Sequence, residues 1–271
     1  MWTDREIDAN GLRVHFWRTG GDLPPLVLAH GATDSGACWG RFAAALSDRF
    51  DVIAPDARGH GLTTAPDADY SRGAMAADLA AFIEALGLDR PLVAGHSMGA
   101  AAVLNLVAGW PAIARAAVLE DPGFRLGTDA ADRMGSMRAR MREERERRLS
   151  ISHAEIVAEG KVANPKWDDL EFDAWAAAKR QVSPHFLAPS SVPAQADWQS
   201  LLTSVTCPVL LVTADNPPLA NGAVTPEAAV IAKESCATLE VVNLPGAGHN
   251  VRREQFGPFV AAVGAFLARH A

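Results

Sequence analysis

The segment Gly95-His96-Ser97-Met98-Gly99 constrains the fold of this chain more than any other stretch. An apolar run at 92–94 precedes it and a helical pattern begins at Ala100, so Ser97 is expected at a sharp corner between a buried strand and a helix. Such a corner strains the serine backbone, and glycines two residues before and after it prevent collisions across the turn. The G-x-S-x-G pattern in this context is typical of a serine whose hydroxyl stands exposed at the end of a sheet.

Short apolar runs alternate with helical patterns around this corner. Asn10-Gly11, between two alternating segments, predicts an antiparallel hairpin at the start of the chain. Further strands are expected at 25–29, 51–55, 92–94, 116–119, 208–213 and 238–244, and helices at 38–48, 71–86, 98–108, after 225 and at 253–268. Strands that alternate with helices predict a mostly parallel sheet with helices on both faces. Ligands bind such sheets at the carboxyl ends of the strands.

The pattern changes between the strand near 118 and the strand near 210. Residues 124–205 contain no convincing buried strand, and they combine amphipathic helical patterns with several prolines, at positions 165, 184, 189 and 193. We therefore expect a helical cap at 124–205, inserted into a core domain formed by 1–123 and 206–271. The 271 residues suit one such domain with an insertion better than two independent domains.

Composition limits the partners of the protein. A net charge of −7 argues against nucleic acid, because phosphate binding requires a basic face. The three cysteines, at 38, 207 and 236, contain no C-x-x-C pair and suggest neither a disulfide framework nor a metal site. No run approaches the roughly 18 apolar residues of a membrane span, and the first residues do not resemble a signal peptide. We expect a cytoplasmic protein with no membrane partner, either a monomer or a homodimer.

A serine hydroxyl is a weak nucleophile at neutral pH and requires an adjacent base. His249 is the candidate base, because it follows the last predicted strand in a glycine-containing turn from which its ring could reach Ser97. A carboxylate must then orient the imidazole. Asp121 and Asp215 both end strands that lie between the serine and the histidine in the chain, so the order of residues alone leaves both possible.

Four motifs in this order resemble the α/β-hydrolase superfamily: His30-Gly31, Asp56-x-x-Gly59-His60-Gly61, Gly95-His96-Ser97-Met98-Gly99 and Gly248-His249. The resemblance covers nearly all of the chain except the cap. It implies the α/β-hydrolase fold, a mostly parallel eight-stranded sheet with helices on both faces and an inserted cap. It also implies hydrolysis through an acyl-enzyme, with no metal and no cofactor. The backbone N–H groups of Ala32 and Met98 would form the oxyanion hole.

The same resemblance bears on the choice of acid. The family acid commonly stands three residues after the end of the strand that follows the cap, and that position here is Pro217. A minority of members, among them deformylase-like and lactonase-like hydrolases, use the acid at the end of the preceding strand instead. Val118-Leu119-Glu120-Asp121-Pro122 resembles that arrangement, so Asp121 is favoured and Asp215 is the alternative.

We therefore predict a serine hydrolase that cleaves a small carboxylic ester, a lactone or an amide. A cofactor-free oxygenase or a C–C bond hydrolase of the same fold, and a non-catalytic ligand-binding module, remain alternatives. An apolar or partly aromatic small-molecule substrate is expected because aromatic residues are concentrated in and near the cap. The candidates for lining its pocket are Trp39, Phe124, Trp167, Trp175 and Phe186.

Overall fold

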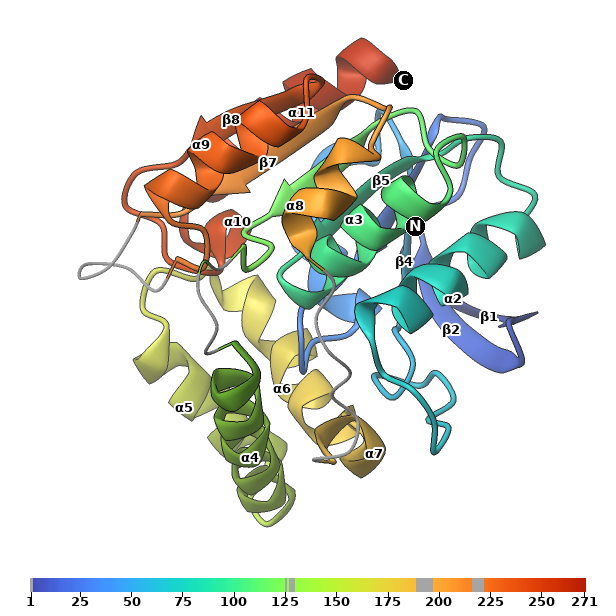
Figure 1. Cartoon of the computed structure of the whole chain (residues 1–271). Helices are drawn as coiled ribbons and strands as arrows, with labels where there is room; N and C mark the ends of the chain where they lie inside the picture. The colour runs from blue at the N-terminus through green and yellow to red at the C-terminus, as the bar shows by residue number, and fades with distance from the viewer. Residues whose placement is uncertain (1, 125, 127–129, 189–196, 216–221) are drawn as a thin grey trace.

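The computed structural model of the protein describes residues 2–124, 126, 130–188, 197–215 and 222–271. The described residues form one eight-stranded sheet in the order β1-β2-β4-β3-β5-β6-β7-β8 (Figure 1). The strands are β1 Thr3–Ala9, β2 Leu12–Arg18, β3 Pro25–Ala29, β4 Asp51–Pro55, β5 Leu92–His96, β6 Ala117–Glu120, β7 Val209–Thr213 and β8 Leu239–Asn243. Only the pairs β1–β2 and β2–β4 are antiparallel, which confirms the mostly parallel sheet predicted from the sequence.

The hairpin at the start of the chain forms as expected. Asn10 and Gly11 both have positive φ angles, of 49° and 72°, which the tight turn between antiparallel strands requires. The strands β3 to β7, in contrast, are buried along nearly their whole length. Helices on both faces account for this burial.

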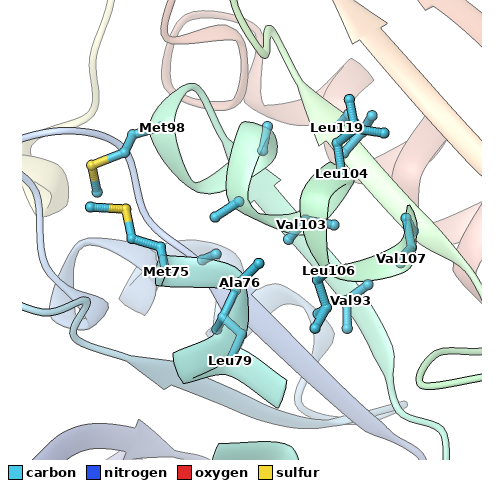
Figure 2. Close-up of a cluster of buried hydrophobic side chains, with 14 of the residues drawn as sticks. Met75, Ala76, Leu79, Val93, Met98, Val103, Leu104, Leu106, Val107 and Leu119 are labelled. Carbon is cyan, nitrogen blue, oxygen red and sulfur yellow. The ribbon is translucent and has the colours of Figure 1, made fainter. Parts of the chain in front are cut away.

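The helices form a layer on each face of the sheet. One layer contains α2 (Arg72–Ala85), α3 (Met98–Gly109), α8 (Trp198–Thr203) and α9 (Pro226–Ser235); the other contains α1 (Gly40–Leu46) and α11 (Phe256–His270). Figure 2 shows part of the first layer, where the thioether side chains of Met75 from α2 and Met98 from α3 face each other. The start of α3, at the corner that carries Ser97, is thus packed directly against α2.

The C-terminal segment differs in detail from the expected helix at 253–268. It forms the short helix α10 (Val251–Glu254) and then α11, with Gln255 between them at φ −130°. A 3₁₀ turn, η1 (Gly36–Trp39), likewise precedes α1. No helix among the residues described is long and apolar enough to cross a membrane.

Four helices between β6 and β7 stand beyond one end of the sheet (Figure 1). They are α4 (Ala130–Leu149), α5 (His153–Ala163), α6 (Phe172–Gln181) and α7 (Pro184–Leu187), with the 3₁₀ turn η2 (Asp169–Glu171) before α6. Ile156, Trp167, Phe172 and Trp175 form a small core of their own there. The helix α8 lies within the span assigned to the cap, but it packs against α3 and α9. The boundaries at 123/124 and 205/206 remain predictions.

Candidate active site

Ser97 occupies the corner between β5 and α3 in a strained conformation, with φ 51° and ψ −111°. Its N–H donates to the carbonyl of Glu120 at 2.9 Å, which fixes the corner against β6. A Cβ atom on Gly95 would lie 2.5 Å from the carbonyl carbon of Gly99, and one on Gly99 would lie 2.2 Å from the carbonyl oxygen of Ala29. Only glycine fits at either position, for the steric reason inferred from the sequence.

His249 lies between Ser97 and Asp121. Its Nε2 is 2.9 Å from Ser97 Oγ, and its Nδ1 is 2.6 Å from Asp121 Oδ2. An ionised carboxylate can only accept hydrogen bonds, so Nδ1 carries the proton and donates a hydrogen bond to Asp121. The lone pair of Nε2 then faces the serine hydroxyl, as a general base requires.

Asp121, directly after β6, is fully buried and is held from a second side. Its carboxylate accepts hydrogen bonds from the N–H groups of Ala223 and Val224, at 2.8 and 3.0 Å. Its own backbone has φ 44°, in the left-handed region that non-glycine residues seldom adopt. These contacts leave the Asp121 carboxylate little freedom to move away from His249.

Asp215, the alternative acid, has a different set of contacts. Its Oδ2 accepts from the N–H of Gly246 at 2.5 Å, and its own N–H donates to the carbonyl of Ala247 at 3.0 Å. Asp215 therefore holds the turn that precedes His249, and it makes no hydrogen bond to the imidazole in this structure. Pro217 lies outside the described residues.

The two predicted oxyanion donors border the same cavity as Ser97. Met98 is the first residue of α3, so its N–H has no acceptor within the helix. Ala32 lies in a loop, and within the described part of the chain its N–H makes no hydrogen bond to a backbone carbonyl. The next residue, Thr33, has φ 61°, so this loop is held in a conformation that is unusual for a non-glycine residue.

His96, inside the G-x-S-x-G motif, has a positioning role that the sequence analysis missed. Burial and the neighbouring His249 keep the pKa of His96 well below the usual value, so its imidazole is neutral. Its Nε2 lies 2.9 Å from the carbonyl oxygen of His249 and must donate to it. The ring also fills the space above Gly31, where a Cβ atom would lie 2.5 Å from His96 Nδ1. His96 thus ties the His249 turn to the strand that carries Ser97.

A buried ion network connects the loop at 32–34 to helices α6 and α10. Asp34 accepts from Lys179 Nζ of α6 at 2.8 Å and pairs with Arg253 Nη1 of α10 at 3.1 Å. Lys179 Nζ also donates to the carbonyl and to the hydroxyl of Thr33, at 3.0 and 2.9 Å. Burial would raise the pKa of Asp34, but the guanidinium of Arg253 and the ammonium of Lys179 outweigh it and hold that pKa below its usual value.

The network continues on both sides of Arg253 with charges of alternating sign. Arg253 Nε donates to Glu171 at 3.0 Å, and its neighbour Arg252 pairs with Glu120 at 3.5 Å. Glu120 points away from Asp121, and its Oε1 accepts the N–H of Arg252 at 2.8 Å. Three carboxylates therefore balance three cations across the cap and the core. Since these residues come from distant segments, no local sequence pattern could have revealed the network.

A cavity of about 790 Å³ opens over Ser97 and His249. Trp167 and Trp175, two of the five pocket candidates, are among the residues that line it. The rest of the described lining includes the charged side chains of Asp34, Arg72, Arg140, Lys179 and Arg253. Charged and aromatic side chains therefore border the same cavity, and the expected apolar or partly aromatic substrate stays a prediction.

The other three pocket candidates lie outside this lining. Trp39 is buried in the core, with the guanidinium carbon of Arg252 4.0 Å from its ring centroid. Phe124 stacks on Trp198 with ring centroids 4.5 Å apart. Phe186 packs edge-on against His60 at 4.4 Å. The sequence offered these aromatic side chains as candidates for lining the pocket, but composition cannot distinguish a position in the core from one in the cavity wall.

Known proteins resemble this chain in sequence. A model of the alpha/beta hydrolase family matches residues 26–262. The 2-(acetamidomethylene)succinate hydrolase of Mesorhizobium japonicum is 28% identical over 256 residues, 91% of this chain and 88% of that protein. The N-formylmaleamate deformylase of Pseudomonas putida is 42% identical over 118 residues, and that match spans only 43% of this chain and 44% of the relative.

Solved structures resemble this one over almost its full length. The crystal structure of E-2-(acetamidomethylene)succinate hydrolase has a TM-score of 0.82 at 23% identity, and covers 99% of this chain and 100% of that chain. The N-formylmaleamic acid deformylase of Pseudomonas putida S16 has a TM-score of 0.77 at 25% identity, and covers 96% of this chain and 100% of that chain. The likeness extends across the cap as well as the core.

Proposed function

The chain belongs to the alpha/beta hydrolase family, and from this premise we propose that it is a serine hydrolase with Ser97 as nucleophile, His249 as general base and Asp121 as the orienting acid. The observation that carries the proposal is the continuous chain of hydrogen-bond contacts from Asp121 through His249 to Ser97, at 2.6 and 2.9 Å. A cavity above Ser97 leaves room for a substrate carbonyl.

In the proposed mechanism, Ser97 Oγ attacks the carbonyl carbon of the substrate while His249 Nε2 takes the hydroxyl proton. The carbonyl oxygen becomes an oxyanion and accepts hydrogen bonds from the N–H groups of Ala32 and Met98. His249 then gives its proton to the departing alcohol or amine, which leaves an ester between Ser97 and the acyl group. Water then attacks the carbonyl carbon of this ester while His249 takes one of its protons. When the bond to Ser97 Oγ breaks, the carboxylic acid is released and His249 returns the proton to Ser97.

The proposed substrates are small carboxylic esters, lactones and amides, all of which pass through the same oxyanion. Both relatives named above are hydrolases, one of them a deformylase, which supports cleavage of an acyl bond. A cofactor-free oxygenase or a C–C bond hydrolase would use the same serine and histidine differently. Trapping of an acyl-enzyme, with turnover that does not consume oxygen, would exclude the oxygenase.

The proposal is tested by labelling and by substitution of the serine. A fluorophosphonate should add one phosphonyl group at Ser97, as read by peptide mass spectrometry. Ser97→Ala should lower kcat at least about 10⁴-fold on the best substrate from a panel of nitrophenyl esters, lactones and amides.

The matched control is Ser136→Ala, which removes a hydroxyl from the lining of the same cavity without touching the triad. It should keep kcat within about threefold, because Ser136 takes no part in the proposed proton transfers and its side chain is exposed. A Ser97→Ala protein that turns over at the wild-type rate would refute the assignment of the nucleophile.

A further inference from the structure

Four cationic side chains border the cavity over Ser97, and they are not equivalent. Lys179 and Arg253 are neutralised by the buried ion network, because Asp34 lies within 3.1 Å of both and Glu171 binds Arg253 as well. Neither Arg72 nor Arg140 has a carboxylate partner among the described residues. The cavity lining therefore includes two arginines whose charge no carboxylate of the described residues balances.

Arg72, the first residue of α2, is the more unusual of the two. Among the described residues, the one hydrogen-bond acceptor of its Nη1 is the thioether sulfur of Met75, at 3.7 Å, and a thioether is a weak acceptor. Its Nε is buried and has no hydrogen-bond partner in the described part of the chain. Burial and the nearby Arg138 lower the pKa of Arg72 to about 10, so the group is still charged at neutral pH.

A buried cation without a counter-charge destabilises the folded protein. Helix α2 does not require this side chain, because the hydroxyl of Ser71 already caps it by accepting from the N–H of Ala74. No contact of Arg72 in the described structure offsets its desolvation. The guanidinium thus lacks an anionic partner, as expected of a group that binds an anionic ligand.

We propose that Arg72, assisted by Arg140 on α4, binds a carboxylate of the substrate, so that the ester, lactone or amide that is cleaved also bears a free acid group. A guanidinium fork can bind a carboxylate through two parallel hydrogen bonds, which fixes its orientation as well as its position. Arg140 is exposed on the cap side of the cavity, where it can add attraction without being buried. This proposal rests on the hydrolase function proposed above and names its substrate class.

The position of Arg72 also suits an anchor for a small substrate. Arg72 shares the cavity wall with Ala101, Pro122 and Gly123, and these four residues also border a smaller adjoining void. Ala101 lies about one helical turn from Ser97 in α3, and Pro122 directly follows Asp121. A carboxylate bound at Arg72 would therefore hold a short acid with its reacting carbonyl near the nucleophile.

The test compares monoethyl half-esters with the corresponding diethyl esters, for dicarboxylic acids from malonate to adipate. The wild-type protein should prefer a half-ester in kcat/KM. Arg72→Met should lose about 10- to 100-fold on that half-ester, mainly through KM, with little change on the neutral diester, as expected for one charge-assisted contact. Arg72→Lys should recover part of the loss, because it keeps the charge but not the fork.

The matched control is Arg5→Met, which removes the same charge from an exposed position on β1, far along the sheet order from Ser97. It should leave the half-ester preference unchanged. The melting temperature of Arg72→Met should equal or exceed that of the wild type, because the variant loses a half-buried cation that has no carboxylate partner among the described residues. A purely structural arginine would instead show a lowered melting temperature and equal losses on both esters, which would overturn the proposal.

A binding experiment separates this proposal from the hydrolase function. Calorimetry with the free dicarboxylates on Ser97→Ala should show binding that Arg72→Met in the same background abolishes. If no ester is hydrolysed but this binding is seen, the anion site stands and the hydrolase assignment fails. If esters are hydrolysed without preference for half-esters, and adding Arg72→Met to Ser97→Ala does not weaken dicarboxylate binding, the hydrolase function is supported and the anion site is refuted.

Discussion

The carboxyl ends of β6 and β7 are adjacent in the sheet and both are followed by an aspartate, yet the two aspartates have different surroundings. Asp121 after β6 is fully buried and accepts from His249, Ala223 and Val224. Asp215 after β7 is partly exposed and accepts from the N–H of Gly246. One carboxylate contacts the imidazole, and the other supports the turn that carries it.

The difference shows that chain order does not select the acid of such a site. Both aspartates come after the serine and before the histidine in the chain. What distinguishes them is the segment at 222–224, which supplies two N–H donors to Asp121 and encloses it. Asp121 also has a left-handed backbone conformation, with φ 44°, which no sequence pattern predicted.

Of the substitutions at the two aspartates, Asp121→Asn is expected to have the largest effect, and that effect is on kcat. The asparagine would present an NH₂ group to Nδ1 and favour the wrong tautomer of His249, so kcat should fall on the order of 10⁴-fold. Steady-state kinetics on the best substrate measures this, and an unchanged melting temperature shows that the fold is retained. A variant with more than a tenth of the wild-type kcat would refute the assignment of Asp121.

A second difference is expected in stability when each carboxylate is removed. Asp121→Ala leaves the buried N–H groups of Ala223 and Val224 without an acceptor, and each such group costs about 1–3 kcal/mol. The free energy of unfolding should therefore fall by about 3 kcal/mol, as measured by urea denaturation. Asp215→Ala is the matched control and should cost about 1 kcal/mol, because its acceptor role lies in an exposed turn. Equal losses of unfolding free energy in Asp121→Ala and Asp215→Ala would show that the two carboxylates stabilise the fold to the same extent, contrary to this prediction.

The smallest effect is expected for Asp215→Asn. Asparagine keeps an oxygen that can accept from Gly246, and Asp215 makes no hydrogen bond to His249. We expect kcat within about threefold of the wild type and a stability loss of less than about 1 kcal/mol. If kcat instead fell as far as in Asp121→Asn, both carboxylates would have to act on His249, directly or through water.

Much of the fold could be predicted because local patterns report local conformation. The two glycines around Ser97 predicted a strained corner, and Asn10-Gly11 predicted a hairpin, since each depends on a few neighbouring residues. The alternation of strands and helices then predicted a mostly parallel sheet, which the structure confirms. The same order limited the candidates for base and acid to His249 and two aspartates.

The sequence by itself thus determined the sheet, the corner with its serine and the histidine that could reach it. Only the tertiary structure decided which aromatic residues line the cavity and which charges around it are balanced. Lys179 forms an ion pair with Asp34, which is 145 positions away in the chain, while Arg72 has no carboxylate partner in the described structure. The physical reason is that local periodicity predicts whether a side chain is buried, whereas its partner depends on how the cap and the core pack together.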